Sequence, residues 1–448
     1  MSPTWRRPLR RLAATTTALA LSMVAVAACS SSPAPADAPA SSGPTTISWW
    51  SWNPDDTSAP AWIKSFEAEH PEIKVDHRFI QYSDYVNAVR LAATSGSGPD
   101  VFGLQVGALT TQFAPVTADL APLAEKNIGP DWKDKLLQSD QLQVDGKQVG
   151  LPWMITGGGL LWYNKTLLDK VGVKPPTTLE EWKSSCKKVE AAGTTCFVQG
   201  AKDDWQNIDV YQSILNQISP GSFYTAVKGE TPFNNPDSVR AFDVWKSLFD
   251  DGIVQKGALG STVYPDANDQ FNKGKAAMIA LGTWQDSNMT KTALKTAAGT
   301  YGEQITKQVF LPVPFPDVVG GAKESGRLFG GPDVGWAVSA KSEKKDAAFT
   351  LVQWLTTSET AQRQMAKSTQ TPALKSVPVD DSDLVDPTLM KPVLAEQATQ
   401  INNLIGARQI PNADVQTALG QALSGVASGQ LSSAEAAASV QQAVDAAK

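Results

Sequence analysis

Histidine is nearly absent from this chain of 448 residues, which contains only His70 and His77. Neither has a cysteine beside it, so a zinc site, a Ser-His-Asp triad or a Cys-His pair would have almost nothing to use. We assign structural roles to both, His70 at a helix end before a proline and His77 within a strand. We therefore expect no metal site and no cofactor.

Other enzyme signatures are missing as well. The sequence contains no Gly-x-Ser-x-Gly elbow and no phosphate-binding loop that ends in Gly-Lys-Ser/Thr. The glycine-rich residues 95–100 and 157–159 precede or interrupt strand-like segments, so they do not present a helix N-terminus to a phosphate. Adjacent acids such as Asp203–Asp204 and Asp380–Asp381 are typical of solvated surface. We expect a protein that is not an enzyme.

Blocks of basic side chains are also lacking. The formal net charge is −6, and removal of residues 1–28 would take away four arginines and no acid. The sign is wrong for nucleic-acid binding, and we expect no such partner.

Long apolar runs are limited to one, residues 12–27, which is too short for a comfortable transmembrane helix. Arginines precede it and Val-Ala-Ala-Cys ends it at Cys29, which indicates an export signal over residues 1–28. The ending resembles the lipobox of bacterial lipoproteins, in which the cysteine becomes the first residue and carries the lipid. An ordinary signal peptide with an incidental cysteine is the alternative.

Cysteine is scarce, with three in the chain. If Cys29 is lipidated, Cys186 and Cys196 remain as a pair outside the cytoplasm, where disulfides persist. A bridge would close a short loop between a helix and the next strand; two buried thiols are the alternative.

A tether and two lobes are expected downstream of the signal. Residues 29–44 are rich in Ser, Pro and Ala and nearly free of large apolar groups, which is typical of a disordered leash. The roughly 400 residues that follow exceed what one hydrophobic core usually supports.

Apolar periodicity predicts alternating strands and helices. Residues 45–52, 73–80 and 99–106 are strand-like, and residues 58–70 and 82–96 between them have helical spacing. This β-α-β-α-β order indicates an α/β fold with a mainly parallel sheet. Residues 275–284 are again strand-like, residues 346–366 predict one long helix, and the chain is helical from about residue 395.

Tryptophan is abundant, and four tryptophans fall where strands end: Trp52, Trp153, Trp205 and Trp284. Ligands of open α/β sheets bind outside the C-terminal ends of strands, where an indole can stack on the CH face of a sugar. Burial of ~60 Å² of such surface is worth roughly 1.5 kcal/mol. From the residues alone, core packing and ligand contact both remain open for each. Four others lie inside helical patterns and are expected in the core: Trp62, Trp182, Trp245 and Trp354.

Four longer motifs carry a family resemblance. They are Ser-Gly-Ser-Gly-Pro-Asp-Val in residues 95–105, the Gly-Lys, Leu-Pro, Tyr-Asn-Lys, Pro-Pro-Thr and Glu-Glu-Trp series in 145–182, Phe-x-x-Gly-Lys-Ala-Ala-Met…Gly-Thr-Trp in 271–284, and the Gly-Gly strand and following helix in 329–362. In this order, behind a lipobox, they resemble the extracellular solute-binding proteins, family 1, of ABC sugar importers, which are maltose-binding-protein-like.

The resemblance implies a two-lobed α/β fold of the type II periplasmic-binding class. Each lobe would be a mainly parallel sheet flanked by helices, with the ligand cleft between lobes. One lobe would hold residues 45–155 and 331–375, and the other residues 156–330 and 376–448. Hinge closure over a carbohydrate would present both lobes to an ABC permease. The protein would be a monomer, held at the extracytoplasmic face of the bacterial cell membrane through its lipid anchor only.

The resemblance also implies where the ligand binds. Trp284 matches the family's recurrent sugar-stacking tryptophan, whereas Trp49 and Trp50 are expected as core anchors where the leash ends. The full set of implied ligand-binding residues is Trp52, Asn53, Asp55, Gln105, Trp153, Thr156, Trp205, Trp284, Gly331 and Asp333.

Two departures argue against malto-oligosaccharide as the ligand. Gln416 stands where maltose binders carry a further aromatic, and Gly157 where they have an acid. The same fold could instead hold a polyol, a glycerophosphodiester or a compatible solute. A cationic ligand would need an aromatic box with acids, and a phosphorylated one would need arginine, for which Arg327 and Arg408 are the nearest candidates. A lipid-anchored glycan hydrolase, with two carboxylates across a cleft, is the third reading.

Overall fold

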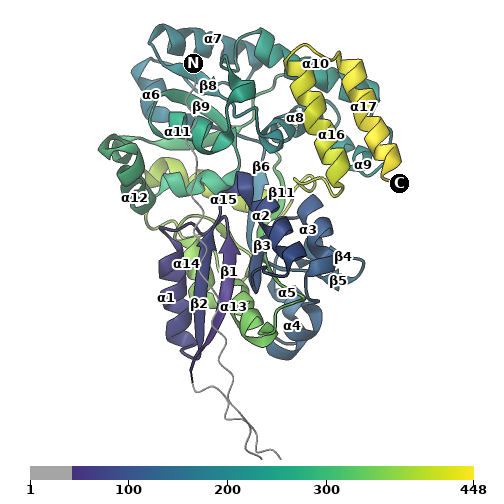
Figure 1. Ribbon diagram of the computed structural model, residues 1–448. Coiled ribbons are helices and arrows are strands. Elements are labelled where there is room, and N and C mark those ends of the chain that lie inside the picture. The colour runs from purple at the N-terminus through teal and green to yellow at the C-terminus, as the bar shows by residue number, and fades with distance from the viewer. Residues whose placement is uncertain (1–42) are drawn as a thin grey trace, which may run out of the picture. The chain divides into compact units, whose positions relative to one another are not determined.

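Two β-sheets covered by helices organise the part of the chain that the computed structural model describes, residues 43–448 (Figure 1). The first sheet has six strands in the order β12 (Thr371–Pro372), β6 (Leu151–Gly158), β11 (Phe329–Val338), β3 (Val101–Leu104), β1 (Thr45–Ser51) and β2 (Ile73–Phe79). The second has four, in the order β10 (Phe310–Pro314), β7 (Leu160–Asn164), β9 (Ala276–Leu281) and β8 (Thr195–Val198). A small ladder joins β4 (Gln143–Val144) to β5 (Lys147–Gln148). We call the parts built on these two sheets the first and second lobes.

The first lobe begins with the predicted β-α-β-α-β order. Helix α1 (Ala59–Glu69) follows β1, and α2 (Tyr82–Ser95) follows β2 and ends at Gly96, whose φ of 76° suits glycine. Strand β1 pairs in parallel with β2, from Thr45 opposite Ile73 onward, and with β3 on its other side. The N-terminal α/β prediction is confirmed.

Both sheets are mixed, where mainly parallel sheets were expected. Strand β11 runs antiparallel to β3 and to β6, and β7 runs antiparallel to β9 and β10. The reason is topological: the chain leaves the first sheet along β6 and re-enters it along β11, so these two neighbours run in opposite directions. Between the strands of residues 43–448, pairing is parallel for β1 with β2 and β3 and for β8 with β9.

Two crossings join the sheets. Gly159 separates β6 from β7 with a φ of 96°, and a side chain there would press on the ring of Phe329, 3.1 Å from the added carbon. The return passes from β10 to the start of β11. The expected lobe boundaries near residues 155 and 331 stay a prediction, and the signal peptide, Cys29 and most of the tether lie outside the described residues.

Helices cover the sheets on both sides. In the first lobe these are α1, α2, α3 (Ala108–Phe113), α4 (Ala121–Asn127), α5 (Trp132–Lys135), α13 (Lys345–Thr357) and α14 (Glu359–Ala366). The rest of the chain adds α6 (Lys165–Lys170), α7 (Leu179–Ala191), α8 (Asp204–Ile218), α9 (Ser222–Ala226), α10 (Pro236–Asp250), α11 (Asn268–Asn272), α12 (Lys291–Tyr301), α15 (Pro387–Ile401), α16 (Ala413–Ala427) and α17 (Ser433–Ala446). Helices α16 and α17, at the end of the chain, pack with α8 and α10 (Figure 1).

The long helix expected over residues 346–366 is broken. Ser358, with φ −75° and ψ 130°, ends α13 and begins α14. Neither glycine nor proline marks this break, so the apolar periodicity did not reveal it. The helical C-terminal region is likewise divided, by residues 402–412 between α15 and α16.

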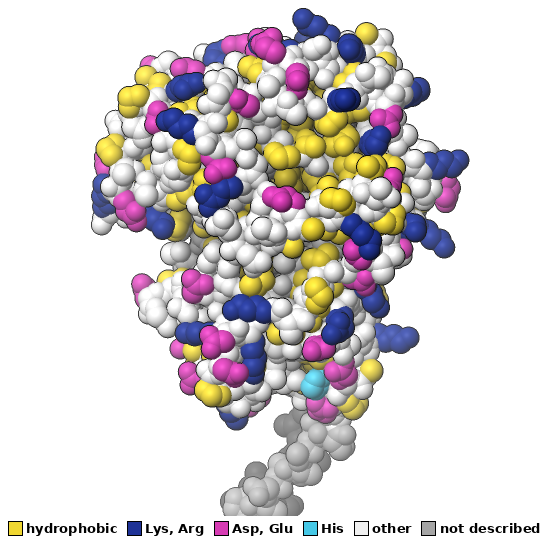
Figure 2. Space-filling view, turned by 180° about the vertical axis from the view of Figure 1, so that it is seen from behind, with side chains coloured by type: hydrophobic (Ala, Val, Ile, Leu, Met, Phe, Trp, Pro, Cys, Tyr) yellow, Lys and Arg dark blue, Asp and Glu magenta, His cyan; other side chains and the backbone are white. Residues whose placement is uncertain are grey.

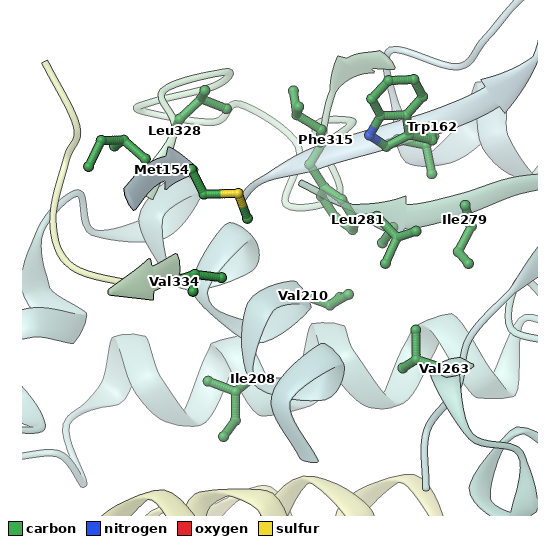
Figure 3. Close-up of a cluster of buried hydrophobic side chains, with 14 of the residues drawn as sticks. Met154, Trp162, Ile208, Val210, Val263, Ile279, Leu281, Phe315, Leu328 and Val334 are labelled. Carbon is green, nitrogen blue, oxygen red and sulfur yellow. The ribbon is translucent and has the colours of Figure 1, made fainter. Parts of the chain in front are cut away.

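The core runs through both crossings. Figure 3 shows Met154 of β6 and Val334 of β11 in the same cluster as Trp162 of β7 and Leu281 of β9. The core assignments of Trp62, Trp182, Trp245 and Trp354 are confirmed, since each is buried.

The tryptophans of β1 differ from one another. Trp49 is fully buried, as expected, and its ring lies 5.1 Å from that of Trp336. Trp50 is only half-buried, and the guanidinium of Arg78 lies 4.6 Å from its ring centroid. The prediction of a core anchor is therefore right for Trp49 and wrong for Trp50, because that face of β1 is covered incompletely.

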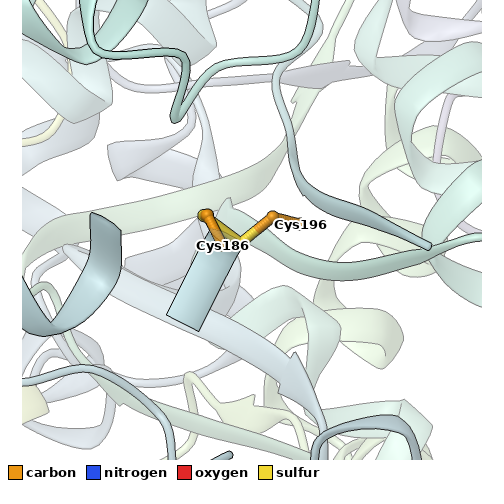
Figure 4. The surroundings of a disulfide bond; sticks show 2 residues. All are labelled: Cys186 and Cys196. Atoms are coloured by element: carbon orange, nitrogen blue, oxygen red, sulfur yellow. A yellow bond between two sulfur atoms is a disulfide. The ribbon is translucent and has the colours of Figure 1, made fainter. Parts of the chain in front are cut away.

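A disulfide joins Cys186 of α7 to Cys196 at the start of β8 (Figure 4). Both cysteines are buried. The bridged alternative is confirmed, and the link fastens a helix to the edge strand of the second sheet.

The surface carries charges of both signs. Figure 2 shows Lys and Arg interspersed with Asp and Glu on one face, with apolar side chains gathered near its centre. Within residues 43–448, no helix combines the length and the apolar character that a membrane span needs.

Candidate functional site

A cavity of about 320 Å³ opens where the ends of several strands face the second lobe. Its lining residues are Trp52, Asn53, Asp55, Phe79, Gln81, Tyr82, Gln105, Met154, Trp205, Tyr264, Trp284, Asp333 and Arg408. Seven of the ten residues expected to bind ligand are among them. The first lobe contributes residues that follow β1 and β3, as strand C-terminal ends in α/β sheets do.

Three expected residues lie elsewhere. Trp153 is 2% exposed and packs in the core, its ring 5.1 Å from Trp62 and 5.4 Å from Trp336. Successive side chains of a strand point to opposite faces, so Met154 faces the cavity in its place. Thr156 and Gly331 line a much smaller neighbouring void.

The first-lobe wall is built on Trp52. Its ring meets Tyr82 and Tyr85 edge-on, with centroids 5.5 and 4.7 Å away. Gly103 makes this possible, because a side-chain carbon there would lie 2.7 Å from the indole. The ring is therefore held in place by β3 and α2.

Asp55 also has a local structural task. Its Oδ1 accepts hydrogen bonds from the backbone and hydroxyl groups of Ser58, at 2.9 and 2.7 Å, and from those of Thr57. These bonds order the turn that leads into α1. The carboxylate at the cavity is thus oriented before any ligand arrives.

The second-lobe wall is an aromatic cluster of three rings. Trp205 begins α8, Tyr264 lies in the π-helical segment η4 (Val263–Ala267), and Trp284 lies in the 3₁₀ segment η5 (Thr283–Met289) after β9. Trp205 stacks on Tyr264 at 6.1 Å with an interplanar angle of 16°, and Trp284 meets Trp205 edge-on at 6.0 Å. The indole N–H of Trp284 donates to the hydroxyl of Tyr264 at 3.1 Å.

Arg408 stands at the centre of the polar groups. Its Nε lies 3.0 and 2.9 Å from the two carboxylate oxygens of Asp209, on α8, and its Nη1 lies 3.3 Å from Oδ1 of Asp333, on β11. Its guanidinium carbon is 4.3 Å from the ring centroid of Trp284 and 5.2 Å from that of Trp205. The side chain is 8% exposed.

The series of hydrogen-bonded polar side chains continues from Arg408 into the first lobe. Asp333 accepts a hydrogen bond from the amide of Gln105, whose oxygen accepts one from Tyr82 at 2.7 Å. A continuous path of hydrogen bonds therefore runs from α2 through β11 to α8. It links the two lobes along one side of the cavity.

Burial and charge act against each other in this cluster. Burial raises the pKa of Asp209 to about 6, while the guanidinium of Arg408 opposes the rise. For Arg408, burial alone would lower the pKa, but Asp209 and Asp333 outweigh it and raise the pKa above its ordinary value. The ion pair is consequently charged at neutral pH.

Several residues in or behind the cavity wall escaped the sequence reasoning, among them Asp209, which contacts Arg408 and does not itself line the cavity. Tyr264 lies in an irregular segment without strand or helix periodicity, and Asp209 is one acid within a helical pattern. Arg408 was recognised only as a nearby arginine. Their meeting depends on segments about 140 to 200 positions apart in the chain.

The arrangement is suited to holding a ligand. It combines ring faces, amide and hydroxyl groups and an ion pair, and residues 43–448 hold no group of three or more His, Cys, Asp or Glu placed to bind a metal ion. Aromatic walls with a few convergent polar groups are typical of small-molecule binding sites.

Two mixed sheets that face each other across such a cavity define a two-lobed α/β binding protein. The chain belongs to the bacterial extracellular solute-binding protein family, whose model matches residues 49–362.

Curated proteins of low sequence identity to the chain also carry the names of binding proteins. A multiple sugar-binding protein of Streptococcus mutans is 25% identical over 333 residues, which cover 72% of the chain and 74% of that protein. A putative binding protein of Brucella abortus is 24% identical over 233 residues. That match covers 51% of the chain and 55% of the relative, so the chain spans about half the length of this relative.

The fold also matches solved structures. A chitin oligosaccharide binding protein superposes with a TM-score of 0.72 at 21% identity, covering 90% of this chain and 99% of that one. The two-lobed architecture inferred from the sequence is thereby confirmed.

Proposed function

We propose that the chain is a lipid-anchored, extracytoplasmic substrate-binding protein that captures a sugar or oligosaccharide between its lobes and delivers it to an ABC importer. The observation that carries this proposal is the cavity itself, in which Trp52 and the second-lobe aromatic cluster lie beside hydrogen-bonding groups. A sugar offers CH faces to such rings and hydroxyl groups to such donors and acceptors.

The polar groups support a hydroxylated ligand. Burial of a hydroxyl without a partner is costly, and Gln105, Asp333 and Arg408 converge on the cavity with donors and acceptors already oriented by one another. The names of two similar proteins, the multiple sugar-binding protein and the chitin oligosaccharide binding protein, point to the same chemical class.

Anchoring and delivery rest on the sequence. Cys29 ends the lipobox-like segment, and residues 29–44 would serve as a leash that lets the lobes turn towards a permease. In this proposal the protein acts as a monomer, and the residues that contact sugar are Trp52, Asn53, Asp55, Gln105, Trp205, Trp284 and Asp333.

A ligand screen tests the proposal. Purified residues 30–448 are heated with a panel of mono- and oligosaccharides, and a ligand that binds the folded state raises the midpoint of unfolding by mass action. We expect at least one sugar to do so, with measurable binding heat and no product. Reducing sugar released in proportion to protein concentration would contradict a binding function, and a panel without any response would contradict a sugar ligand.

A further inference from the structure

We infer that Arg408 sets the charge class of the ligand: the cavity takes an uncharged solute because the chain's own guanidinium occupies the place that the rings and carboxylates would otherwise offer to a cation. That the solute is a sugar rests on the proposed function. The existence of a latent cation site beneath Arg408 does not depend on that function.

The surroundings of Arg408 form a cation-binding box. The indoles of Trp205 and Trp284 lie within 5.2 and 4.3 Å of the guanidinium carbon, and Asp209 and Asp333 bind its nitrogens. Aromatic faces with nearby acids are the means by which proteins recognise ammonium and guanidinium ligands. In this protein the two indoles and the two carboxylates already contact a cation, the guanidinium of Arg408.

The backbone holds the guanidinium at this place. The N–H of Arg408 donates to the carbonyl of Gly330 at 3.3 Å, and its carbonyl accepts from Nε2 of Gln212 at 2.8 Å. Residue 408 is thus attached both to β11 and to α8. A ligand ammonium would have to displace a side chain whose backbone is held by hydrogen bonds on both sides.

Anionic ligands are disfavoured for a different reason. The arginine is shared between two carboxylates, and Asp55 adds another at the cavity. A carboxylate or phosphate on the ligand would meet an excess of negative charge in a site where water screens poorly. The guanidinium has further N–H groups beyond these two ion pairs, and they can donate to neutral hydroxyls.

The first experiment empties the box. We compare the wild type with Arg408→Met, which keeps much of the side-chain volume, and titrate each with methylguanidinium chloride against sodium chloride at equal ionic strength. The ion should raise the unfolding temperature of Arg408→Met and leave that of the wild type unchanged, since only the variant has an unoccupied box.

Arg78→Met is the matched control. It also removes a guanidinium from an indole, that of Trp50 at 4.6 Å, but at a site away from the cavity. The inference is wrong if methylguanidinium stabilises the wild type or Arg78→Met as much as it stabilises Arg408→Met. If Arg408→Met does not fold, Arg408→Met with Asp209→Asn removes the uncompensated carboxylate, keeps Asp333 and both rings, and should respond to the ion in the same direction.

The second experiment uses the wild type alone. Neutral, amino and uronic forms of the same sugars, such as glucose, glucosamine and glucuronate and their disaccharides, are compared by calorimetry. A neutral sugar that binds should lose about tenfold or more in affinity when a carboxylate is introduced, because the carboxylate meets the excess of negative charge. An ammonium group in its place should give no gain in affinity, because Arg408 already occupies the box. Tighter binding of the amino form, or equal or tighter binding of the uronic form, would overturn the inference. If no form binds, the proposed sugar function fails, while the methylguanidinium response still decides whether the box exists.

Discussion

At the scale of single residues, the site depends on which ring faces are covered. Arg408 covers part of Trp205 and Trp284, whereas Trp52 is supported edge-on by two tyrosines. A ligand therefore meets rings that are already held in place. Side-chain entropy that would otherwise be lost on binding has been lost on folding instead, which favours affinity.

Trp284→Ala should weaken sugar binding by about tenfold or more, because a stacked CH face of ~60 Å² is worth roughly 1.5 kcal/mol. The side chain is partly exposed at the cavity, so the unfolding temperature should fall less than it would on loss of a fully buried tryptophan. Isothermal calorimetry with a ligand from the screen measures the first effect and thermal unfolding the second.

Trp50→Ala is the control for this prediction, since it removes a half-buried indole that does not line the cavity. It should leave the affinity unchanged. A large loss of stability in Trp284→Ala with unchanged affinity would instead show that Trp284 serves the core.

At the scale of elements, strands β6 and β11 of the first sheet carry residues that line the cavity. They pair with each other and belong to the first sheet, and Met154 and Asp333 reach the cavity from them. A side-chain carbon at Gly157 of β6 would lie 2.7 Å from Leu328. The close packing at this crossing leaves no space for the acid that maltose binders carry there.

The disulfide acts on a different pair of elements, α7 and β8. Replacement of Cys186 and Cys196 together by serine should lower the free energy of unfolding by about 2–3 kcal/mol, the chain-entropy value for a loop that short. Ligand affinity should not change, because neither element lines the cavity.

Chemical denaturation measures this effect, and the wild type unfolded under reducing conditions provides the comparison. The reduced wild type and the double variant should have similar stability. A double variant as stable as the oxidised wild type would show that the bridge contributes nothing to folding.

At the scale of the whole molecule, the cavity lies where two sheets built on separate stretches of chain face each other. One side of it is bridged by the path of hydrogen bonds from Tyr82 to Asp209. Hinge motion of such lobes is the expected means of enclosing a ligand. Asp333 and Arg408 lie on this path, so a change in the arrangement of the lobes would have to preserve or break their hydrogen bonds.

Cys29→Ala should release the full-length protein from membranes into the soluble extracytoplasmic fraction, because the lipid would have no attachment point. Fractionation and immunoblotting measure this. The Cys186 and Cys196 serine variant should stay with the membrane, as its anchor is intact. Persistent membrane association of Cys29→Ala would refute lipidation at this residue.

Local signals in the sequence were sufficient for the α/β class, whereas the expected site residues, seven of which line the cavity, were implied by the family resemblance. Apolar periodicity and turn residues act over a few positions, and strand C-terminal ends meet at one edge of a sheet. The positions of Trp52 and Trp284 at strand ends could thus be recognised without coordinates, while Gln105 was implied by the resemblance alone, and the contact of all three with a ligand stays a prediction.

Tertiary structure alone decided the strand directions, the core position of Trp153 and the cluster around Arg408. Antiparallel pairing of β6 with β11 follows from how the chain returns between sheets, which no local pattern records. The faces that Trp153 and Met154 present depend on the register of that pairing. Arg408 meets Asp209 and Asp333 because packing brings distant segments together, and this packing buries their opposite charges beside the cavity.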